Sequence, residues 1–265
     1  MITAIDFKTA QRLLKDRHDI FSLKIGAALY SYDGYDFCGV YAGENILIGR
    51  YYNDFIIRTD ECLTDETAEE LLLFLTIWGW GEVLCGFETG KRLARLGGMD
   101  YTENVLLKFS SGLIPENETT PYFDDLKENP LLDTVFPIIK DGFPDVVYED
   151  WYTDISHKVR HKISKVYVYG GATATVMAET EKAAFVSLLA VKKELRGRGN
   201  AKSLIRSLGI HFEDQKKEMS LLCRDELVPF YKKAGFYEAG RVISFSAVNH
   251  RLSERPQNAY IPAEC

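Results

Sequence analysis

The sequence predicts an α/β protein that is built from two similar units. Three observations support this fold class. The 265 residues are enough for two compact domains. Apolar residues follow helical spacing in some segments and short, strand-like runs in others along the whole chain. The predicted elements then occur twice in the same order, which indicates an internal structural repeat.

The first half shows strand and helix signals in a clear succession. Gly43-Glu44 separates two strand-like runs as a hairpin turn, and Thr64 is placed to cap a strongly apolar helix. Gly97-Gly98 then ends the last helix of this half. The pattern predicts a helix over 7–16, strands over 37–42, 45–50 and 55–58, a helix over 69–78, a strand over 83–87, a helix over 88–96 and a strand over 104–109.

The second half repeats that order after a segment rich in proline and polar residues. Residues 110–129, together with Pro130, contain three prolines and predict a linker or a long crossing segment. Helices are then predicted over 131–140 and 147–162, strands over 165–169, 172–180 and 184–191, a helix from 201, a strand over 219–223, a helix over 227–234 and a strand over 237–246. The expected domains are therefore residues 1–112 and 131–265, with the linker over 113–130. The competing interpretation is that an α/β chain produces such an order by chance.

Charge and cysteine content exclude several classes of function. The formal net charge is −7, whereas nucleic acid or an anionic membrane surface needs a basic footprint, so neither is an expected partner. The five cysteines are odd in number and include no C-x-x-C pair, which argues against a disulfide framework or a zinc site. The start of the chain resembles no signal peptide, and the longest apolar run, 71–81, is too short for a membrane span. A cytoplasmic protein without a bound metal is expected.

The strongest functional signal is a glycine turn between a strand and a helix. An apolar strand ends near Val191, a short turn contains Gly197 and Gly199, and an amphipathic helix begins at Ala201. Glycine lets the backbone adopt positive φ and lets a ligand approach closely. Amide N–H groups at the start of a helix bind anions, and Arg196 and Arg198 add positive charge at the same place. The turn predicts a phosphate or pyrophosphate site.

These residues resemble a known family. Arg196-x-x-Gly199-x-Ala201, directly after an apolar strand, is similar to the R/Q-x-x-G-x-G/A motif of the GCN5-related N-acetyltransferase (GNAT) family. The later segment 221–236 resembles that family's strand and helix ending in Y-x-x-x-G-F, with Tyr231 at the tyrosine. The resemblance covers about residues 131–246. One departure is Arg224-Asp225, where many members have an asparagine that contacts the cofactor, so cofactor contacts from that turn are in doubt.

The resemblance implies two GNAT-like units with mixed, mostly antiparallel sheets, and an N-acyltransferase that uses acetyl-CoA or another acyl-CoA. The acceptor would be a small-molecule or peptide amine that attacks directly in a ternary complex. A backbone N–H near 189–191 would polarise the thioester carbonyl, and Tyr231 would protonate the leaving thiolate. The implied cofactor-binding residues are Leu189, Ala190, Val191, Arg196, Gly197, Arg198, Gly199, Asn200 and Ala201.

The equivalent link in the first half lacks these features. Residues 58–68 contain four carboxylates and no glycine, so a pyrophosphate would be repelled there. We therefore expect a degenerate N-terminal GNAT-like unit without a cofactor loop. The alternative is that residues 1–112 form an unrelated α/β cap.

Candidates for the acceptor side come from the second predicted helix of the C-terminal half and the strand that follows. Trp151 and Tyr152 are candidates to line the acceptor site, and His157, His161 and Glu179 are candidate general bases. For each of these residues, core packing or a solvated position is the competing interpretation. His157 and His161 share a helix face, but no third metal ligand is evident.

Two further functions remain open from the sequence. One is a non-catalytic module that binds or senses acyl-CoA. The other is an aminoacyl-transferring enzyme of paired GNAT-like units, which the acidic charge and the intact glycine loop argue against. The sequence leaves the acceptor, the acyl chain length and the oligomeric state undetermined.

Overall fold

The computed structural model describes residues 1–115 and 120–247, and residue contacts divide them into two units. Unit 1 comprises Met1–Asn104 together with the segment that begins at Arg241. Unit 2 comprises Val105–Gly240. The two units therefore do not follow the predicted boundaries at 112 and 131, because each unit includes a strand from the other half of the sequence.

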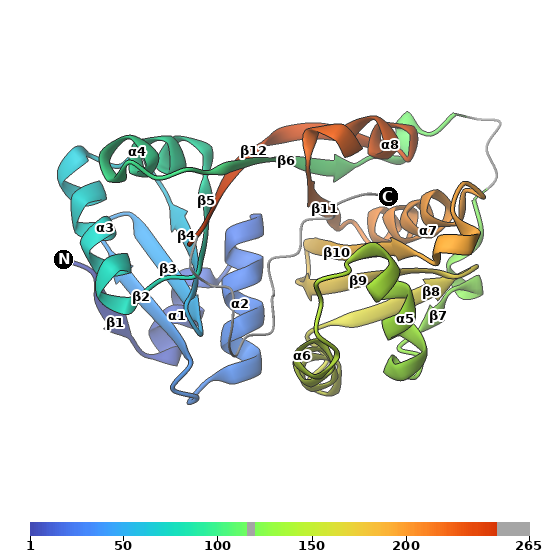
Figure 1. Ribbon diagram of the computed structural model, residues 1–265, viewed down its shortest axis with the longest axis horizontal. Helices are drawn as coiled ribbons and strands as arrows, with labels where there is room; N and C mark the ends of the chain where they lie inside the picture. Colours follow the sequence, from blue (N-terminus) through green and yellow to red (C-terminus); the bar gives the residue numbers. More distant parts are fainter. Residues whose placement is uncertain (116–119, 248–265) are drawn as a thin grey trace. The chain divides into compact units, whose positions relative to one another are not determined.

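Unit 1 is an α/β sheet with helices on both faces (Figure 1). Its elements are β1 (Thr3–Ile5), α1 (Phe7–Leu14), α2 (Ile20–Tyr32), β2 (Cys38–Gly43), β3 (Ile46–Tyr51), β4 (Asp54–Thr59), α3 (Asp65–Trp78), β5 (Glu82–Gly86) and α4 (Phe87–Gly97), followed by the start of β6 (Thr102–Phe109). The strand order is β1-β2-β3-β4-β5-β12, antiparallel except for the parallel pair β4 and β5.

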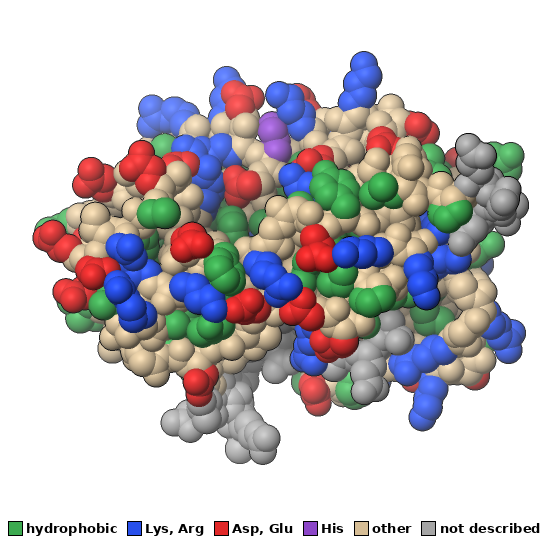
Figure 2. Space-filling view, turned by 90° about the horizontal axis from the view of Figure 1, so that it is seen from above, with side chains coloured by type: hydrophobic (Ala, Val, Ile, Leu, Met, Phe, Trp, Pro, Cys, Tyr) green, Lys and Arg blue, Asp and Glu red, His purple; other side chains and the backbone are tan. Residues whose placement is uncertain are grey.

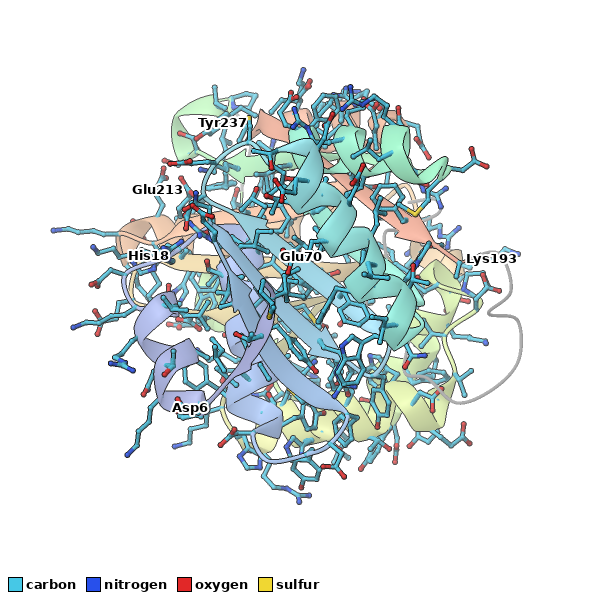
Figure 3. The ribbon with its side chains drawn as sticks, turned by 90° about the vertical axis from the view of Figure 1, so that its left-hand side faces the viewer. Asp6, His18, Glu70, Lys193, Glu213 and Tyr237 are labelled. Carbon is cyan, nitrogen blue, oxygen red and sulfur yellow. The ribbon has the colours of Figure 1, made fainter. Side chains whose placement is uncertain are left out.

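Side-chain caps define where the helices of unit 1 begin. Asp6 precedes α1 and accepts a hydrogen bond from the backbone N of Thr9 at 2.7 Å (Figure 3). Thr64 caps α3 in the same way, with the backbone N of Thr67 3.2 Å from its hydroxyl, as the sequence predicted. These caps satisfy N–H groups that have no partner within the helix.

The order of elements in the first half of the sequence recurs in the second half, which supplies most of unit 2. After two 3₁₀ turns, Ser111–Leu113 and Phe123–Asp125, come β7 (Lys127–Glu128), α5 (Leu132–Gly142), α6 (Tyr148–Arg160), β8 (Lys165–Tyr169), β9 (Ala172–Glu179), β10 (Ala183–Val191), α7 (Asn200–Asp214), β11 (Glu218–Cys223), α8 (Val228–Lys233) and β12 (Phe236–Ser246). Its strand order is β6-β11-β10-β9-β8-β7, with β10 and β11 the parallel pair. The predicted repeat in the order of elements is confirmed, with β1, α2 and β7 as additional elements that the sequence did not predict.

The last strand of each repeat pairs in the other unit. Residues Val105–Lys108 of β6 pair with β11 in unit 2. Residues Val242–Ser246 of β12 pair with β5 in unit 1. Each sheet is therefore completed by a strand from the other half of the sequence. The segment that the sequence predicted as a linker also contributes β7, which pairs with β8.

Two apolar clusters cover the two faces of the unit 2 sheet (Figure 1). The cluster on the α7 face, called the α7 cluster, includes Leu204, Leu208, Leu221, Tyr231 and Phe236. The cluster on the α5 and α6 face, called the α6 cluster, is formed by Val135, Ile138, Ile139, Phe143, Val146, Trp151, Ile155, Val166, Leu188 and Ala190. The strands of unit 2 are thus buried on both faces, which fixes their register.

Cys38, Cys62, Cys85 and Cys223 are free thiols, and Cys265 lies outside the described residues. Among residues 1–115 and 120–247, no helix has both the length and the apolar character needed to span a membrane. The same ranges contain no group of three or more histidine, cysteine, aspartate or glutamate residues suited to a metal ion.

Candidate active site

Strand β10 changes its pairing halfway along its length. It runs parallel to β11 over Ala183–Phe185, and the described ladder between the two strands ends there. On its other side it stays paired with β9, but the register shifts between Ser187 and Ala190, where β10 carries one extra residue. Leu188, inside this bulge, has φ of +52°. A bulge bends the strand and redirects its side chains, and bulges are common beside functional sites.

The strand then leads into the glycine turn that the sequence singled out. Gly197 and Gly199 have φ of +75° and +83°, so each requires a conformation that glycine adopts without strain. A Cβ built on either residue would meet no described heavy atom within 4 Å. The backbone of the turn is therefore open to a close approach by a ligand.

Helix α7 begins directly at this turn. Its N-cap is Gly199, which offers no side chain to the N–H groups of the first turn, and that turn contains no acidic residue. Ser203 donates from its backbone N to the Gly199 carbonyl at 2.9 Å, which is the start of the helical ladder. The preceding N–H groups are not capped by a side chain, and with the positive end of the helix dipole they offer the donors and the potential that an anion requires.

Hydrogen bonds from neighbouring elements hold the turn in place. The Arg196 guanidinium donates to the Asp141 carbonyl at 2.6 Å, and Asp141 accepts from the backbone N of Lys193 at 2.9 Å. Asn200 donates to the Gly170 carbonyl at 2.6 Å. Arg196 thus anchors the turn to the end of α5, whereas Arg198 is exposed on it. Sequence reasoning did not identify Asp141, because its role depends on a contact 55 residues away.

Tyr231 lies in the interior of unit 2. It belongs to the α7 cluster, which also contains Leu189 from β10 and Ala201 from the first turn of α7. Its side chain is 2% exposed, and its ring meets Phe236 edge to face with centroids 5.6 Å apart. The predicted proton donor, the predicted carbonyl-binding strand and the predicted pyrophosphate helix are therefore brought into one cluster.

In its described residues, unit 1 lacks both the bulge and the open helix start at the equivalent place. Strand β4 pairs with β3 in unbroken register from Asp54 to Thr59. The start of α3 is capped by the Thr64 side chain, and Asp65 and Glu66 occupy its first turn. The connecting segment is held by ion pairs, with Asp60 2.7 Å from Arg17 and 2.6 Å from Arg58. An anion at this helix start would meet a satisfied N-terminus and two carboxylates.

The predicted acceptor residues occupy two different environments on α6. Trp151 is buried in the α6 cluster at 6% exposure, with its ring 5.4 Å from Phe136. Tyr152 is exposed at 38% and packs against Tyr148 with centroids 5.4 Å apart. His157 and His161 stack on each other with centroids 4.4 Å apart.

Glu179 lies away from the bulge. It sits opposite Ala184 at the start of β10, so roughly 13 Å of strand separates it from Leu188. Burial raises its pKa, but hydrogen bonds from Lys217 and from Lys165, the latter at 3.0 Å, outweigh that effect and hold the pKa below its ordinary value. A carboxylate held by two lysines is a weak base, which disfavours Glu179 as the group that accepts the amine proton.

Helix α6 also buries an ion pair that sequence reasoning missed. Lys158 Nζ lies 2.8 Å from Asp154 Oδ2, and the two side chains are 7% and 1% exposed. The spacing of Trp151, Asp154, Ile155 and Lys158 at positions i, i+3, i+4 and i+7 places them on one helix face. That spacing could have predicted a buried helix face. It was not recognised, because two of the four residues are charged and charged residues are usually exposed.

The sequence of the C-terminal part matches a known domain family. Residues 139–250 match the family model described as an acetyltransferase (GNAT) domain. No curated protein matches the chain.

Solved structures share the fold across nearly the whole chain. An acetyltransferase of the GNAT family from Colwellia psychrerythraea has a TM-score of 0.56 at 13% identity, over 93% of this chain and 99% of that one. A GCN5-related N-acetyltransferase from Sphaerobacter thermophilus has a TM-score of 0.59 at 14% identity, covering 92% and 94%. A tandem GNAT protein from the clavulanic acid biosynthesis pathway has a TM-score of 0.55 at 7% identity, covering 93% and 98%. At these identities the similarity shows a common fold.

Proposed function

Because residues 139–250 match the GNAT acetyltransferase domain model, we propose that unit 2 transfers an acyl group from acyl-CoA to an amine. The observation that carries this proposal is the path of β10, which leaves β11 after Phe185, bulges at Leu188 and leads into the open turn at Gly197 and Gly199. One continuous segment thus provides the edge that β10 presents after it leaves β11, and then the N-terminus of α7.

The residues present fit acetyl-CoA or another acyl-CoA. The N–H groups around Gly197–Ala201 would hold the pyrophosphate, with Arg198 exposed beside it. Backbone groups of Leu189, Ala190 and Val191 would bind the pantetheine arm as an added strand. Asn200 and Arg196 would act by fixing the shape of the turn, because their side chains bond to backbone carbonyls of unit 2. When bound, acyl-CoA supplies an activated thioester.

Three actions of the protein would then promote transfer. A backbone N–H at the bulge, between Leu189 and Val191, would donate to the carbonyl oxygen as negative charge develops on it. Tyr231 would give its proton to the departing sulfur. Binding both reactants side by side removes most of the entropic cost of bringing them together, so no nucleophile of the enzyme is needed.

The acceptor would be a small-molecule or peptide amine that approaches along α6. The exposed Tyr152 would line its path, and His157 or His161 would accept the amine proton, in preference to the lysine-bound Glu179. We further propose that the reaction takes place in the cytoplasm, where thiols such as the four free cysteines stay reduced. Unit 1 would contribute no second acyl-CoA site, since α3 begins with its own cap and two carboxylates.

Turnover tests the proposal. Purified protein is incubated with acetyl-CoA and a panel of amines and short peptides, and release of free CoA thiol is followed. We expect acceptor-dependent release with at least one amine. Tight CoA binding without transfer to any member of the panel would instead favour a non-catalytic acyl-CoA-binding module.

Replacing Tyr231 by phenylalanine is expected to lower kcat by roughly 10- to 1000-fold, since general acid catalysis contributes on that scale. The ring and its contact with Phe236 are retained, so CoA affinity should be nearly unchanged, the pattern of an interaction made in the transition state. Steady-state kinetics and calorimetry on the same variant measure both quantities.

Tyr167→Phe provides the matched control. Tyr167 is also 2% exposed in unit 2, and its hydroxyl lies 2.9 Å from Glu128, far along the sheet at the β7 edge. Burial, followed by this carboxylate, raises the pKa of Tyr167. Its substitution should cost about 1–3 kcal/mol of stability and leave kcat unchanged. Full turnover in Tyr231→Phe would remove Tyr231 from the mechanism.

A further inference from the structure

On the α5 and α6 side of the unit 2 sheet, two buried polar atoms have no hydrogen-bond partner among the described residues. They are Nε1 of Trp151 and Oγ1 of Thr175. Trp151 is 6% exposed, and Thr175 is fully buried. Leaving a buried donor unpaired costs stability, so native proteins rarely keep one that no other group satisfies. Two such atoms on one side of the same sheet point to a group that binds there.

The two side chains lie on the same face of the unit 2 sheet. Along β9, Thr175 alternates with Ala174 and Val176, which belong to the α7 cluster, so Thr175 points to the opposite face. It is directly opposite Val166 in β8, and cross-strand partners point to the same side. Val166 belongs to the α6 cluster together with Trp151. Thr175 and Trp151 therefore share the face covered by α5 and α6.

Thr175 lies beside the bulge in β10, and Trp151 belongs to the same apolar cluster as the bulge. Thr175 pairs with Ser187, the residue before Leu188. Trp151 shares the α6 cluster with Leu188 and Ala190. This is the stretch of β10 where the proposed function places the thioester, so the acyl chain that extends from the thioester would run past these two polar atoms.

The chemistry of the surroundings defines what can bind. The other members of the α6 cluster are aliphatic or aromatic, which suits a short hydrocarbon chain. The indole N–H is a donor, and the threonine hydroxyl can donate or accept, so together they suit a neutral oxygen. The charged residues on this face of α6, Asp154 and Lys158, form an ion pair with each other at 2.8 Å. A charged group on the acyl chain would therefore find these two side chains already engaged with each other.

We propose that Trp151 and Thr175 recognise an oxygen carried by the acyl chain, so that the preferred donor is a hydroxyacyl- or ketoacyl-CoA. The inference rests on the proposed function, and it names the substrate class of the same site. It assigns Trp151 to the acyl group, whereas sequence reasoning placed it beside the amine. Sites that hydrogen-bond a substrate hydroxyl discriminate strongly against the analogue that lacks it, because the buried polar groups are then left unpaired.

Calorimetry on the full chain tests the preference without an amine acceptor. The probes are acyl-CoAs of matched length: 2-hydroxypropionyl- against propionyl-CoA, and 3-hydroxybutyryl- and acetoacetyl- against butyryl-CoA, with free CoA as reference. We expect at least one oxygenated member to bind roughly tenfold more tightly than its unsubstituted counterpart, a difference of about 1.4 kcal/mol.

Three variants show where the preference originates. Thr175→Val is isosteric and removes only the hydroxyl, so it should abolish the preference, leave the Kd for free CoA unchanged and raise the melting temperature. Trp151→Phe should also abolish the preference. Ser207→Ala is the matched control, because the Ser207 hydroxyl on α7 is equally buried and unpaired, yet lies on the helix of the α7 cluster. It should leave the preference intact.

Each outcome decides the inference. Equal affinities within every pair of probes overturn it, and so does a preference that survives in Thr175→Val. A wild-type protein without preference, combined with a less stable Thr175→Val, would assign the two polar atoms to a buried water. If free CoA binds but no oxygenated chain is preferred, the proposed function stands and this inference fails. If neither CoA nor any acyl-CoA binds, both fail.

Discussion

Replacing Gly199 by glutamate is expected to weaken CoA binding by roughly 100-fold or more while the chain stays folded. The residue has φ of +83°, so a side chain there costs about 1–2 kcal/mol of conformational energy. Its carboxylate would enter the open space above the turn and face the pyrophosphate. At a protein surface, two like unit charges 4 Å apart repel by about 4 kcal/mol, which alone exceeds a 100-fold change in affinity.

A second glycine separates conformational strain from loss of the anion site. Gly98, after α4 in unit 1, has φ of +60° and also has no described heavy atom within 4 Å of an added Cβ. Gly98→Glu should lower the melting temperature about as much as Gly199→Glu and leave CoA affinity unchanged. Calorimetry and thermal unfolding on both variants give the comparison. Unchanged affinity in a folded Gly199→Glu protein would refute the assignment of the turn.

A fragment of residues 131–265 is expected not to fold by itself. It corresponds to the C-terminal domain predicted from the sequence, but it lacks β6, which pairs with β11 through Val105–Lys108. It also lacks Val105, Leu107 and Phe109, all buried in the α7 cluster. Burial of each such side chain contributes about 1.5–3 kcal/mol, so their loss is comparable to the whole stability of a typical domain, about 5–15 kcal/mol.

The fragment of residues 105–240 is the matched comparison. It contains β6, β7 and every member of the α7 cluster and the α6 cluster, and it is one of the two units defined by contacts. It should show cooperative thermal unfolding by circular dichroism, whereas the 131–265 fragment should not. A cooperative, soluble 131–265 fragment would show that β6 is dispensable for unit 2.

Most elements could be predicted from the sequence, and the exceptions have physical reasons. Helix α2 was not predicted, because its residues Ile20–Tyr32 are apolar on nearly all sides and show no single helical stripe. β1 and β7 were missed because they are short, three and two residues long. The exchange of β6 and β12 could not be predicted, because an alternating apolar pattern fixes which face of a strand is buried but not which strand it pairs with.

Some features of the candidate site could also be predicted from the sequence, and others could not. The turn at Gly197 and Gly199 was predictable, since glycine spacing between a strand and a helix encodes its own backbone conformation. The bulge was not, because leucine at position 188 gives no signal for a positive φ. Asp141 and the pairing of Glu179 with two lysines depend on contacts between distant segments. The conformation of the turn could therefore be predicted from the local sequence, whereas the contacts between distant segments that hold the site could not.

The most direct test of the account is the stoichiometry of CoA binding to the full chain, measured by calorimetry. Helix α7 of unit 2 begins at Gly199 without a side-chain cap, whereas α3 of unit 1 begins with the Thr64 cap followed by Asp65 and Glu66. One equivalent of CoA per chain is therefore expected. Two equivalents would contradict the assignment of unit 1 as a degenerate repeat, and no binding would contradict the site itself.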